Sequence, residues 1–434
     1  MTPLPAAKSK KAKQISPPQA PKGMHDILPA EQPYWDRVRK VAKDIADYYN
    51  FLRIDTPLLE KIDLFERSVG APTDIVEKQM FTVTTRGKET LVLRPEATAS
   101  VARAYIEHGL SQMGLPLKLY YEGPMFRYEQ PQAGRYRQFH QLGVEIIATD
   151  NDPIYDVQVI LVFVRFLESL KLKNISIVLN SIGCKNCRPA YRRELQNYYR
   201  SHKESLCEDC ARRFETNPFR LLDCKEEICQ PLKENAPIII DYLCSECHKH
   251  FKIVLEYLEE LGLSYRFNHK LVRGLDYYTK TVFEIMIGES TSAVGGGGRY
   301  DYLIEMLGGK SAPAVGWAAG LERIIEEMKV QGVLVGVRQK PKLSLIYIGD
   351  FAKKRSLLLV EEFRRAGLDI TESLGRESLK SQLRIADKIG SPFALILGQK
   401  EVFEESIIVR DLVTGAQETV SLARVIEIIK RKLK

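Results

Sequence analysis

The residues best suited to chemistry lie in segments that are far apart along the chain. In "GPMFRYEQPQAGRYRQFHQLGVE" (123–145), residues typical of β-strands flank a loop that is rich in arginine. Guanidinium groups bind phosphate oxygens in bidentate fashion and stay charged at any working pH. Arg127, Arg135 and Arg137 therefore predict a clamp for a triphosphate or a nucleic acid. A solvated, salt-bridged hairpin is the commoner meaning of such a loop when it stands alone.

A second segment, "LVRGLDYYT" (271–279), places charged residues and two tyrosines beside the apolar run "TVFEIMI" (281–287). By itself it predicts a β-hairpin whose tyrosines pack in the core while Arg273 and Asp276 pair at the rim. A reaction site is the alternative, and it needs partners elsewhere in the chain.

Two further segments contain few side chains. "AVGWAAGLERI" (314–324) places Arg323 at a predicted helix start after a run of small residues, and "VGGGGRYD" (294–301) is mostly glycine. Backbone of this kind can approach a flat ligand closely, although a flexible loop is the more common meaning of a glycine run.

All eight cysteines fall within 184–247, which speaks for one specialised module rather than for disulfides spread over a secreted protein. Repeated C-x-x-C spacing is typical of structural zinc sites. Eight thiols make two four-thiolate sites, and four pairs combine into two sites in three ways, among which the spacing does not choose. A redox role, or reduced cysteines without metal, are the alternatives. The four pairs are Cys184 and Cys187, Cys207 and Cys210, Cys224 and Cys229, and Cys244 and Cys247.

Helices and strands must bring these segments together. Apolar residues three and four apart predict an amphipathic helix over 31–50 that docks on a sheet. Strands in series, with helices at 97–109 and 152–170 between them, predict an antiparallel sheet flanked by helices rather than a βαβ repeat. The cysteine region interrupts this unit, and alternating strands and helices near the C-terminus predict an α/β module. The predicted parts are a catalytic domain in two pieces (22–182 and 261–333), an inserted cysteine-rich module (183–260), a linker (334–341) and the α/β module (342–434).

Bulk composition excludes few classes of protein. The 434 residues are 44% hydrophobic and carry no apolar run of the roughly 18–20 residues that a membrane span needs, so we expect no membrane insertion. We expect residues 1–21 to form a disordered basic tail. They do not resemble a secretory signal. Five lysines within 1–22 account for +5 of the net charge of +8, and 17 basic against 13 acidic residues give the α/β module +4. That module can accept a phosphate-bearing partner.

In this order, the segments resemble the class II aminoacyl-tRNA synthetases and, in detail, the histidyl-tRNA synthetase family. Segment 123–145 is similar to the second motif of the class and "GLERI" (320–324) to the third, while "LVRGLDYY" and "GGGGRYD" resemble the two signatures of the histidine enzymes. "KGMHDILP", the helix after it and "TPLLE" match the first motif, and "LRPEATA" the amino-acid-binding turn. The resemblance runs from about Pro21 to the C-terminus. It implies an α+β fold with a class II antiparallel sheet flanked by helices, an inserted, mainly helical cysteine module and a C-terminal α/β anticodon-binding domain.

The resemblance also implies an activity and a set of site residues. The activity is ATP-dependent activation of L-histidine to histidyl-adenylate, followed by transfer of histidine to the 3′ end of tRNA(His). Arg127 and Arg273 are the catalytic residues by this analogy. Histidine binding is assigned to Glu96, Ala97, Thr98, Arg127, Gln141, Glu145, Arg273, Tyr277 and Tyr278. ATP binding is assigned to Arg127, Glu129 and Arg323, and contact with the tRNA acceptor end to Gln132, Arg135 and Arg137. Many members of the family carry a basic residue where this chain has Gln130, which weakens the acceptor-stem assignment.

These roles are physically sensible. An α-ammonium group removed from water needs acceptors, which Glu96, Thr98 and Gln141 supply. Glu145 and Tyr278 each read one imidazole nitrogen, so an isosteric apolar amino acid would leave them unpaired, and such discrimination reaches about 10⁴–10⁵-fold. The chemistry is then positioning and charge stabilisation, with magnesium neutralising the leaving diphosphate. Asp276 is assigned a role in orienting Arg273 or its loop. A cytoplasmic homodimer, with the 31–50 helix and the following strand at its interface, is expected by analogy.

Two rival functions keep the same fold. A histidine-sensing regulatory subunit of ATP phosphoribosyltransferase typically lacks the anticodon module and loses the "RGLDYY" and arginine positions, which are intact here. A purely tRNA-binding or kinase-regulatory module has no reason to retain Glu96, Gln141, Glu145 and Tyr278 together.

Overall fold

The computed structural model describes residues 17–70, 75–130, 134–288, 292–336, 341–372, 375 and 378–433. Most of the predicted tail (1–21) lies outside these residues, and 17–21 form no helix or strand. By compactness the chain divides into two units, Met1–Val335 and Gly336–Lys434.

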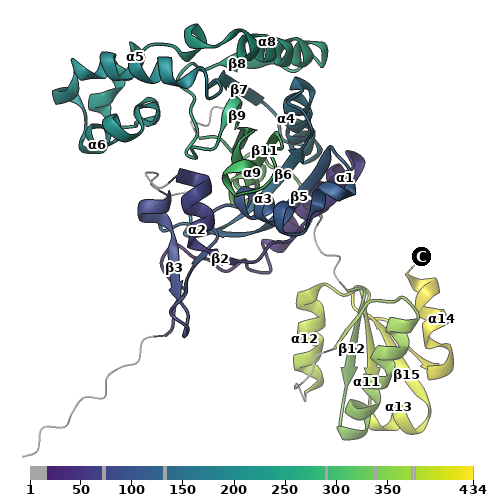
Figure 1. Ribbon diagram of the computed structural model, residues 1–434. Helices are drawn as coiled ribbons and strands as arrows, with labels where there is room; N and C mark the ends of the chain where they lie inside the picture. Colours follow the sequence, from purple (N-terminus) through teal and green to yellow (C-terminus); the bar gives the residue numbers. More distant parts are fainter. Residues whose placement is uncertain are drawn as a thin grey trace, which may run out of the picture. The chain divides into compact units, whose positions relative to one another are not determined.

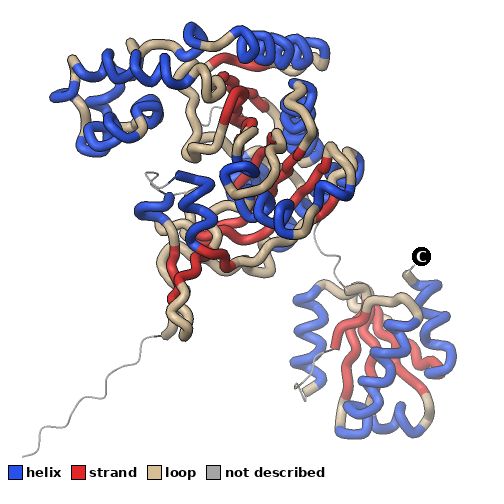
Figure 2. Tube along the Cα trace, viewed as in Figure 1, coloured by secondary structure: helices blue, strands red, loops and turns tan. Residues whose placement is uncertain are grey.

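The first unit contains an eight-stranded sheet with the strand order β1-β5-β6-β11-β10-β9-β7-β8 (Figures 1 and 2). From β5 to β7 all neighbouring strands are antiparallel, as predicted, but β1 pairs with β5 and β7 with β8 in parallel, so the sheet is mixed. Parallel pairing needs a long connection that returns the chain to the same end of the sheet, and the cysteine region supplies it between β7 and β8. The strands are Leu52–Arg53 (β1), Leu117–Phe126 (β5), Gln138–Ile147 (β6), Ile175–Ser181 (β7), Tyr265–Phe267 (β8), Thr279–Ile287 (β9), Gly295–Arg299 (β10) and Ala314–Gly320 (β11).

Helices cover both faces of this sheet. On one face α1 (Gln32–Tyr48), α4 (Pro153–Ser169) and α10 (Leu321–Val330) form a large apolar core with the sheet, in which the rings of Phe163 and Trp317 stack with centroids 4.1 Å apart. The predicted amphipathic helix is confirmed, because Trp35 and Val38 on α1 are buried in this core. On the other face α3 (Thr98–Glu107) and α5 (Arg188–Arg200) pack around a second core that is rich in tyrosine.

Three of the predicted strands form a separate small sheet. β2 (Leu59–Lys61), β4 (Thr90–Leu93) and β3 (Phe81–Thr84) pair in the order β2-β4-β3, all antiparallel. Their alternating patterns predict strands but not which sheet they join, since that depends on pairings distant in the sequence.

The inserted module is mainly helical, as predicted (Figure 2). Its helices are α5, α6 (Glu208–Thr216), α7 (Gln230–Glu234) and α8 (Ser245–Glu260), joined by short 3₁₀ turns such as η5 (Pro218–Asp223).

The second unit has its own sheet and core. Its strand order is β13-β12-β14-β15-β16, with β13, β12 and β14 parallel and the last two strands antiparallel. The predicted α/β character of this part of the chain is confirmed, and its sheet is mixed. The elements are β12 (Leu343–Tyr347), α11 (Asp350–Arg365), β13 (Ile370–Glu372), α12 (Leu379–Ile389), β14 (Phe393–Leu397), α13 (Gln399–Phe403), β15 (Ser406–Asp411), β16 (Gln417–Ser421) and α14 (Leu422–Lys432). In the described part of the whole chain, no helix has both the length and the apolar character that crossing a membrane requires.

Candidate active site

A glycine on the central strand β11 makes room for an acidic side chain on the tyrosine-rich face of the sheet. Gln141 and Glu145 lie four residues apart on β6 and so point to the same face. Across the strand pair they lie opposite Gly320 and Gly316 on β11. A Cβ atom on Gly316 would come within 1.7 Å of Oε2 of Glu145. The glycines predicted to allow close approach of a ligand therefore first admit the carboxyl group of Glu145.

Glu145 is 1% exposed and carries two hydrogen bonds. Thr98 donates from Oγ1 to its Oε1 at 2.7 Å, and the Tyr300 hydroxyl donates to its Oε2. Burial, helped by the neighbouring carboxyl of Glu96, raises the pKa of Glu145 to about 8, although its hydrogen bonds act in the opposite direction. A carboxyl group with this pKa is mostly protonated at pH 7, so it can donate a proton to a ligand as well as accept one.

Glu96 lies at the N-terminus of α3. Its carboxylate accepts the backbone N–H groups of Thr98 (2.7 Å) and Ala99 (2.9 Å), which have no partner within the helix. Burial raises the pKa of Glu96, while these two N–H groups oppose the shift. Ala97 and Thr98, predicted with Glu96 from "LRPEATA", are buried in the same turn.

Tyrosines surround these acidic groups. The ring of Tyr277 lies 4.7 Å from that of Tyr278 and 5.6 Å from that of Tyr300. The hydroxyl of Tyr277 and Oε1 of Gln141 are buried and have no hydrogen-bond partner within the described ranges. Buried polar atoms are rarely left in this state, so both atoms point to a polar ligand that belongs in this pocket.

A cavity of about 270 Å³ opens beside Gln141 and has four arginines in its lining: Arg127, Arg135, Arg273 and Arg323. Backbone carbonyls hold two of them. Arg127 donates from Nε to the carbonyl of Pro95 at 2.9 Å, and Arg323 donates to the carbonyls of Gly134 (3.0 Å) and Ala293 (2.7 Å). Because these carbonyl partners are neutral, the positive charges of Arg127 and Arg323 remain available to bind an anion.

Arg273 lies on a loop over 271–278, before β9, and not in the predicted hairpin. Its Nη1 donates to Oε1 of Glu284, and its guanidinium lies 5.8 Å from the centre of the Tyr278 ring. Burial alone would lower the pKa of Arg273, but Glu284, together with Tyr278 and Tyr277, outweighs this effect and keeps the pKa above its ordinary value. The pairing of Arg273 with Asp276 at the rim, one prediction for this segment, is wrong: Asp276 accepts a hydrogen bond from Nδ2 of Asn217 at 2.8 Å.

The predicted acceptor-end residues are only partly described. Gln132 lies outside the described residues. Arg135 lines the cavity and lies 3.7 Å from the carboxylate of Glu129. Arg137 lies over the ring of Tyr128, 4.0 Å from its centre. Of the three, Arg135 is therefore the one placed beside the candidate ATP site.

Sequence reasoning missed three contributors to this pocket. Glu284 stood out only as the single charge in the apolar run "TVFEIMI". Tyr300 lies within the quoted "GGGGRYD" but received no role. Tyr121, buried beside Glu145, gave no signal, because a tyrosine in a strand is most often part of a core.

The eight cysteines form two compact groups, which decides among the three pairings. The first cysteine group is Cys184, Cys187, Cys244 and Cys247, and the second is Cys207, Cys210, Cys224 and Cys229; within each, the ligand atoms all lie within 4.8 Å of one another. Sulfurs around a tetrahedral zinc are separated by about 3.8 Å, given Zn–S bonds of about 2.3 Å. The Sγ atoms of Cys184 and Cys187 are 3.7 Å apart, and those of Cys207 and Cys224 are 3.8 Å apart.

Backbone N–H groups also point at the sulfurs. Cys187 accepts from the N–H of Cys244 at 3.1 Å, and Cys207 from that of Cys210 at 3.4 Å. Such hydrogen bonds stabilise thiolates, the form in which cysteine binds metal. Both groups therefore fit a thiolate-bound metal ion.

The fold is that of a class II aminoacyl-tRNA synthetase. The family model for histidyl-tRNA synthetase matches residues 23–324, and the model for the anticodon binding domain matches 342–432. The chain belongs to the histidyl-tRNA synthetase family.

Similar proteins agree with this. The chain is 46% identical over 417 residues to a protein from Dehalococcoides mccartyi named histidine–tRNA ligase, covering 96% of this chain and all of the relative. Among solved structures, apo histidyl-tRNA synthetase of S. aureus superposes with a TM-score of 0.77 at 33% identity, covering 94% of this chain and 99% of that one. A Bacillus halodurans structure, described as an ATP phosphoribosyltransferase regulatory subunit/histidyl-tRNA synthetase, has a TM-score of 0.61 at 22% identity, covers 87% of this chain and 97% of its own, and shows a shared fold alone.

Proposed function

We propose that the chain is a histidine–tRNA ligase that activates L-histidine with ATP and transfers it to the 3′ end of tRNA(His), forming AMP and diphosphate. The observation that carries the proposal is the junction of two sites on one sheet face. A buried pocket of carboxyl, amide and phenol groups adjoins a cavity lined by four arginines, and Gln141 and Arg273 contribute to that cavity. The polar groups of the first site suit the charged groups and ring of an amino acid, and the arginines of the second suit a triphosphate.

The amino acid binds through its charged groups and its ring. Glu96, Thr98 and Gln141 receive the α-ammonium, and the unpaired Oε1 of Gln141 is one acceptor for it. Glu145 and Tyr278 each bind one imidazole nitrogen, with Ala97 and Tyr277 completing the pocket. The raised pKa of Glu145 suits this task, because the group can then donate to an unprotonated ring nitrogen or accept from a protonated one.

Activation joins the histidine carboxylate to the α-phosphate of ATP. A carboxylate oxygen attacks the α-phosphorus in line, the new O–P bond forms, and the bond from phosphorus to the diphosphate oxygen breaks. Arg127 and Arg273 lie on either side of the α-phosphate, and Arg323 binds the γ-phosphate. Fixed positive charges stabilise the transition state without a protein nucleophile. Glu129 contacts the adenine end, and magnesium, when bound, neutralises the leaving diphosphate.

The transfer step needs the tRNA. Gln132, Arg135 and Arg137 contact its acceptor end, and the unit from 342 to 434 binds the anticodon. The domain limits 22–182, 183–260, 261–333, 334–341 and 342–434 remain those predicted from the sequence. We further propose that the protein is a cytoplasmic homodimer with α1 and the following strand at its interface, and that each cysteine group holds a structural zinc ion.

Charging of tRNA tests this function. The purified protein, supplied with ATP, magnesium and tRNA(His) transcript, should form acid-precipitable histidyl-tRNA from labelled histidine. A transcript for another amino acid serves as the control and should stay uncharged. Failure to charge tRNA(His), or equal charging of the control, contradicts the proposal.

A further inference from the structure

The cysteine module holds the loop that carries Arg273 and Tyr278. This 271–278 loop has no helix or strand of its own, so its position depends on the groups that contact it. Several of these groups come from the module, and they reach the loop from both cysteine groups.

At its C-terminal end the loop is fixed by residues next to the first cysteine group. Arg188, which follows Cys187 and opens α5, donates from Nη2 to the backbone carbonyl of Tyr278. Gly183, which precedes Cys184, accepts the backbone N–H of Lys280 at 2.9 Å. The backbone at Tyr278 and at Lys280 is thus tied to residues adjacent to the first cysteine group.

At Arg273 and Asp276 the loop is fixed by residues between Cys210 and Cys224 of the second cysteine group. Arg220 on η5 donates from Nη1 to the backbone carbonyl of Arg273 at 2.9 Å, and Asn217 donates to the carboxylate of Asp276 at 2.8 Å. Asn217 and the short turn η5 that carries Arg220 lie between cysteines of the second group, so a metal ion held by that group would fix the ends of their segment.

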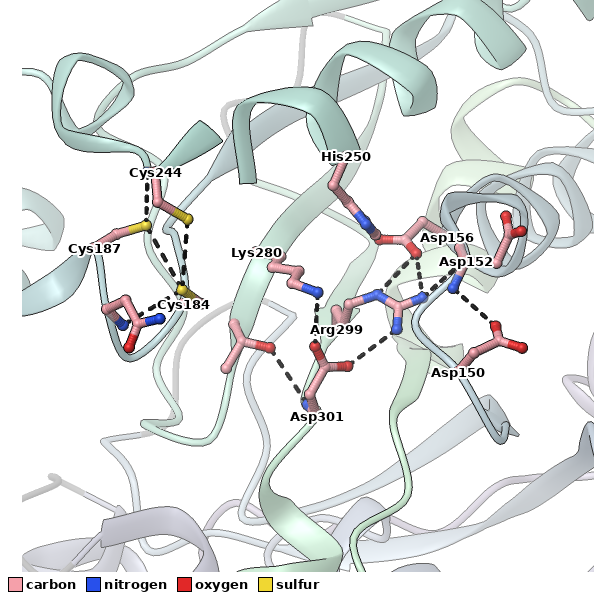
Figure 3. A network of polar contacts seen from close by, with 12 residues as sticks. Asp150, Asp152, Asp156, Cys184, Cys187, Cys244, His250, Lys280, Arg299 and Asp301 are labelled. Atoms are coloured by element: carbon pink, nitrogen blue, oxygen red, sulfur yellow. Dashed lines mark hydrogen bonds and ion pairs between the residues drawn. The ribbon is translucent and has the colours of Figure 1, made fainter. Parts of the chain in front are cut away.

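A buried charge network joins α8, the helix that carries Cys247 of the first cysteine group, to the central sheet (Figure 3). On α8, which begins just after Cys244, His250 lies 3.2 Å from the carboxylate of Asp156. Asp156 pairs with Arg299 at the end of β10, and Arg299 pairs in turn with Asp301 at 3.0 Å. The module is therefore anchored to the sheet and can act as a fixed support.

Asp301 completes the network. It lies 3.4 Å from Nζ of Lys280, whose backbone N–H is the one accepted by Gly183 (Figure 3). Lys280, near the start of β9, is thus held by the module through Gly183 and by the charge network of the sheet through Asp301.

We propose that the two cysteine sites, through Arg188, Asn217 and Arg220, position the 271–278 loop for amino-acid activation. This proposal rests on the proposed function, because one of its two readouts is histidine activation. Arg188, Asn217 and Arg220 are positioning residues, because they contact the backbone of Arg273 and Tyr278 and the carboxylate of Asp276. The module then acts in the first half-reaction, before any tRNA binds.

The direct test removes the two contacts that the module makes with Arg273 and Asp276. In full-length protein carrying Asn217→Ala and Arg220→Ala, the KM for histidine in tRNA-free ATP–diphosphate exchange should rise about tenfold, as expected for the loss of two hydrogen bonds. Hydrogen exchange of the backbone amides of 271–280 should accelerate, while the zinc content stays at the wild-type value. Arg220→Lys, with Asn217 intact, should recover most of the affinity because it keeps a cationic donor. Arg212→Ala is the matched control, since this arginine pairs with Asp209 within α6 and should leave both readouts unchanged.

The outcomes distinguish a failure of the positioning role from a failure of the proposed function. An unchanged KM together with unchanged exchange of 271–280 overturns the positioning role, as does a defect confined to the tRNA transfer step. If wild-type protein does not activate histidine, the proposed function fails, and hydrogen exchange still decides whether the module holds the loop.

The metal is tested separately with Cys207→Ser plus Cys210→Ser. This variant should lose one equivalent of zinc and reproduce the faster exchange of 271–280. If it loses zinc but leaves that exchange unchanged, the second cysteine site does not position the loop. If wild-type protein contains no zinc, the metal proposal fails, and the Asn217→Ala and Arg220→Ala variant still tests the contacts.

Discussion

At the scale of single residues, Glu145 shows what a sequence motif conveys and what it omits. The motif predicts a carboxyl group in the amino-acid pocket. It does not predict that burial raises the pKa of this group to about 8, because that shift depends on three chain segments that enclose the carboxyl group. The partner of Asp276 was misjudged for the same reason, since Asn217 lies 59 residues away.

Glu145→Gln should change how stability depends on pH. The wild-type group keeps its proton to about pH 8 when folded, whereas a glutamate in the unfolded chain loses it near about 4.3. Ionising the folded group costs free energy, so stability present below the unfolded pKa is lost as pH rises through about 8. Glutamine carries no charge, so the Tm of the Glu145→Gln variant relative to that of the wild type should rise by about 5 °C or more between about pH 5 and 8.

Thermal melts of the empty proteins at several pH values measure this. Glu256→Gln, an exposed position on α8, is the matched control and should follow the wild type. A constant Tm difference between Glu145→Gln and wild type across this range would contradict a raised pKa for Glu145.

Arg273→Ala should slow the first half-reaction. The rate of histidine-dependent ATP–diphosphate exchange is expected to fall by at least about 10²-fold, the scale seen when one fixed charge contact to a transition state is removed. Arg165→Ala, which breaks an ion pair with Glu168 on α4, should leave the rate unchanged. Undiminished exchange in Arg273→Ala would refute the catalytic role of this arginine.

At the scale of elements, the glycine run was the feature with the least certain meaning in the sequence. A flexible loop was the commoner expectation, but β10 is a buried strand in the middle of the sheet. A Cβ on Gly297 would come within 1.9 Å of the carbonyl oxygen of Gly316 on β11. Only the pairing of β10 with its neighbours reveals this, since a run of glycines has no alternating pattern to mark a strand.

Gly316→Ala should damage the amino-acid pocket. Its methyl group would collide with the Glu145 carboxyl at 1.7 Å, and overpacking of this kind typically costs about 1–3 kcal/mol. We expect a lower Tm and a KM for histidine raised at least about tenfold. Gly87→Ala, where the nearest atom lies 3.8 Å away, is the control and should change neither value. Wild-type histidine affinity in Gly316→Ala would show that the Glu145 carboxyl does not need this space.

At the scale of the whole molecule, the order of the strands in the central sheet was hard to predict from the sequence. The change from cysteine pairs to alternating strands and helices is visible in local composition. The parallel pairing of β7 with β8 is not visible in local composition, because it joins residues on either side of the whole cysteine module. The pairing of the eight cysteines was open for the same reason, and spatial proximity decides it.

The two units have separate hydrophobic cores, which predicts separable functions. A chain ending at residue 335 should retain histidine-dependent ATP–diphosphate exchange. Its kcat/KM for tRNA(His) should fall at least about tenfold, because contacts with phosphates and bases of the anticodon arm are lost. Parallel assays of exchange and charging measure this, and undiminished charging would contradict an anticodon-binding role.

Zinc content is the corresponding prediction for the cysteine module. Protein purified without chelator should contain two equivalents by elemental analysis, and one equivalent after Cys184→Ser plus Cys187→Ser. A structural zinc ion contributes to folding stability, so chelation should lower the Tm. Less than one equivalent in wild-type protein would refute the zinc assignment.

The central claim is that this protein activates histidine and no other amino acid. ATP–diphosphate exchange without tRNA, run with each of the twenty amino acids, tests it most directly. We expect exchange with histidine, and rates lower by about 10⁴-fold or more with the other amino acids, because they leave Glu145 or Tyr278 unpaired. Equal exchange with another amino acid, or none with histidine, would contradict it.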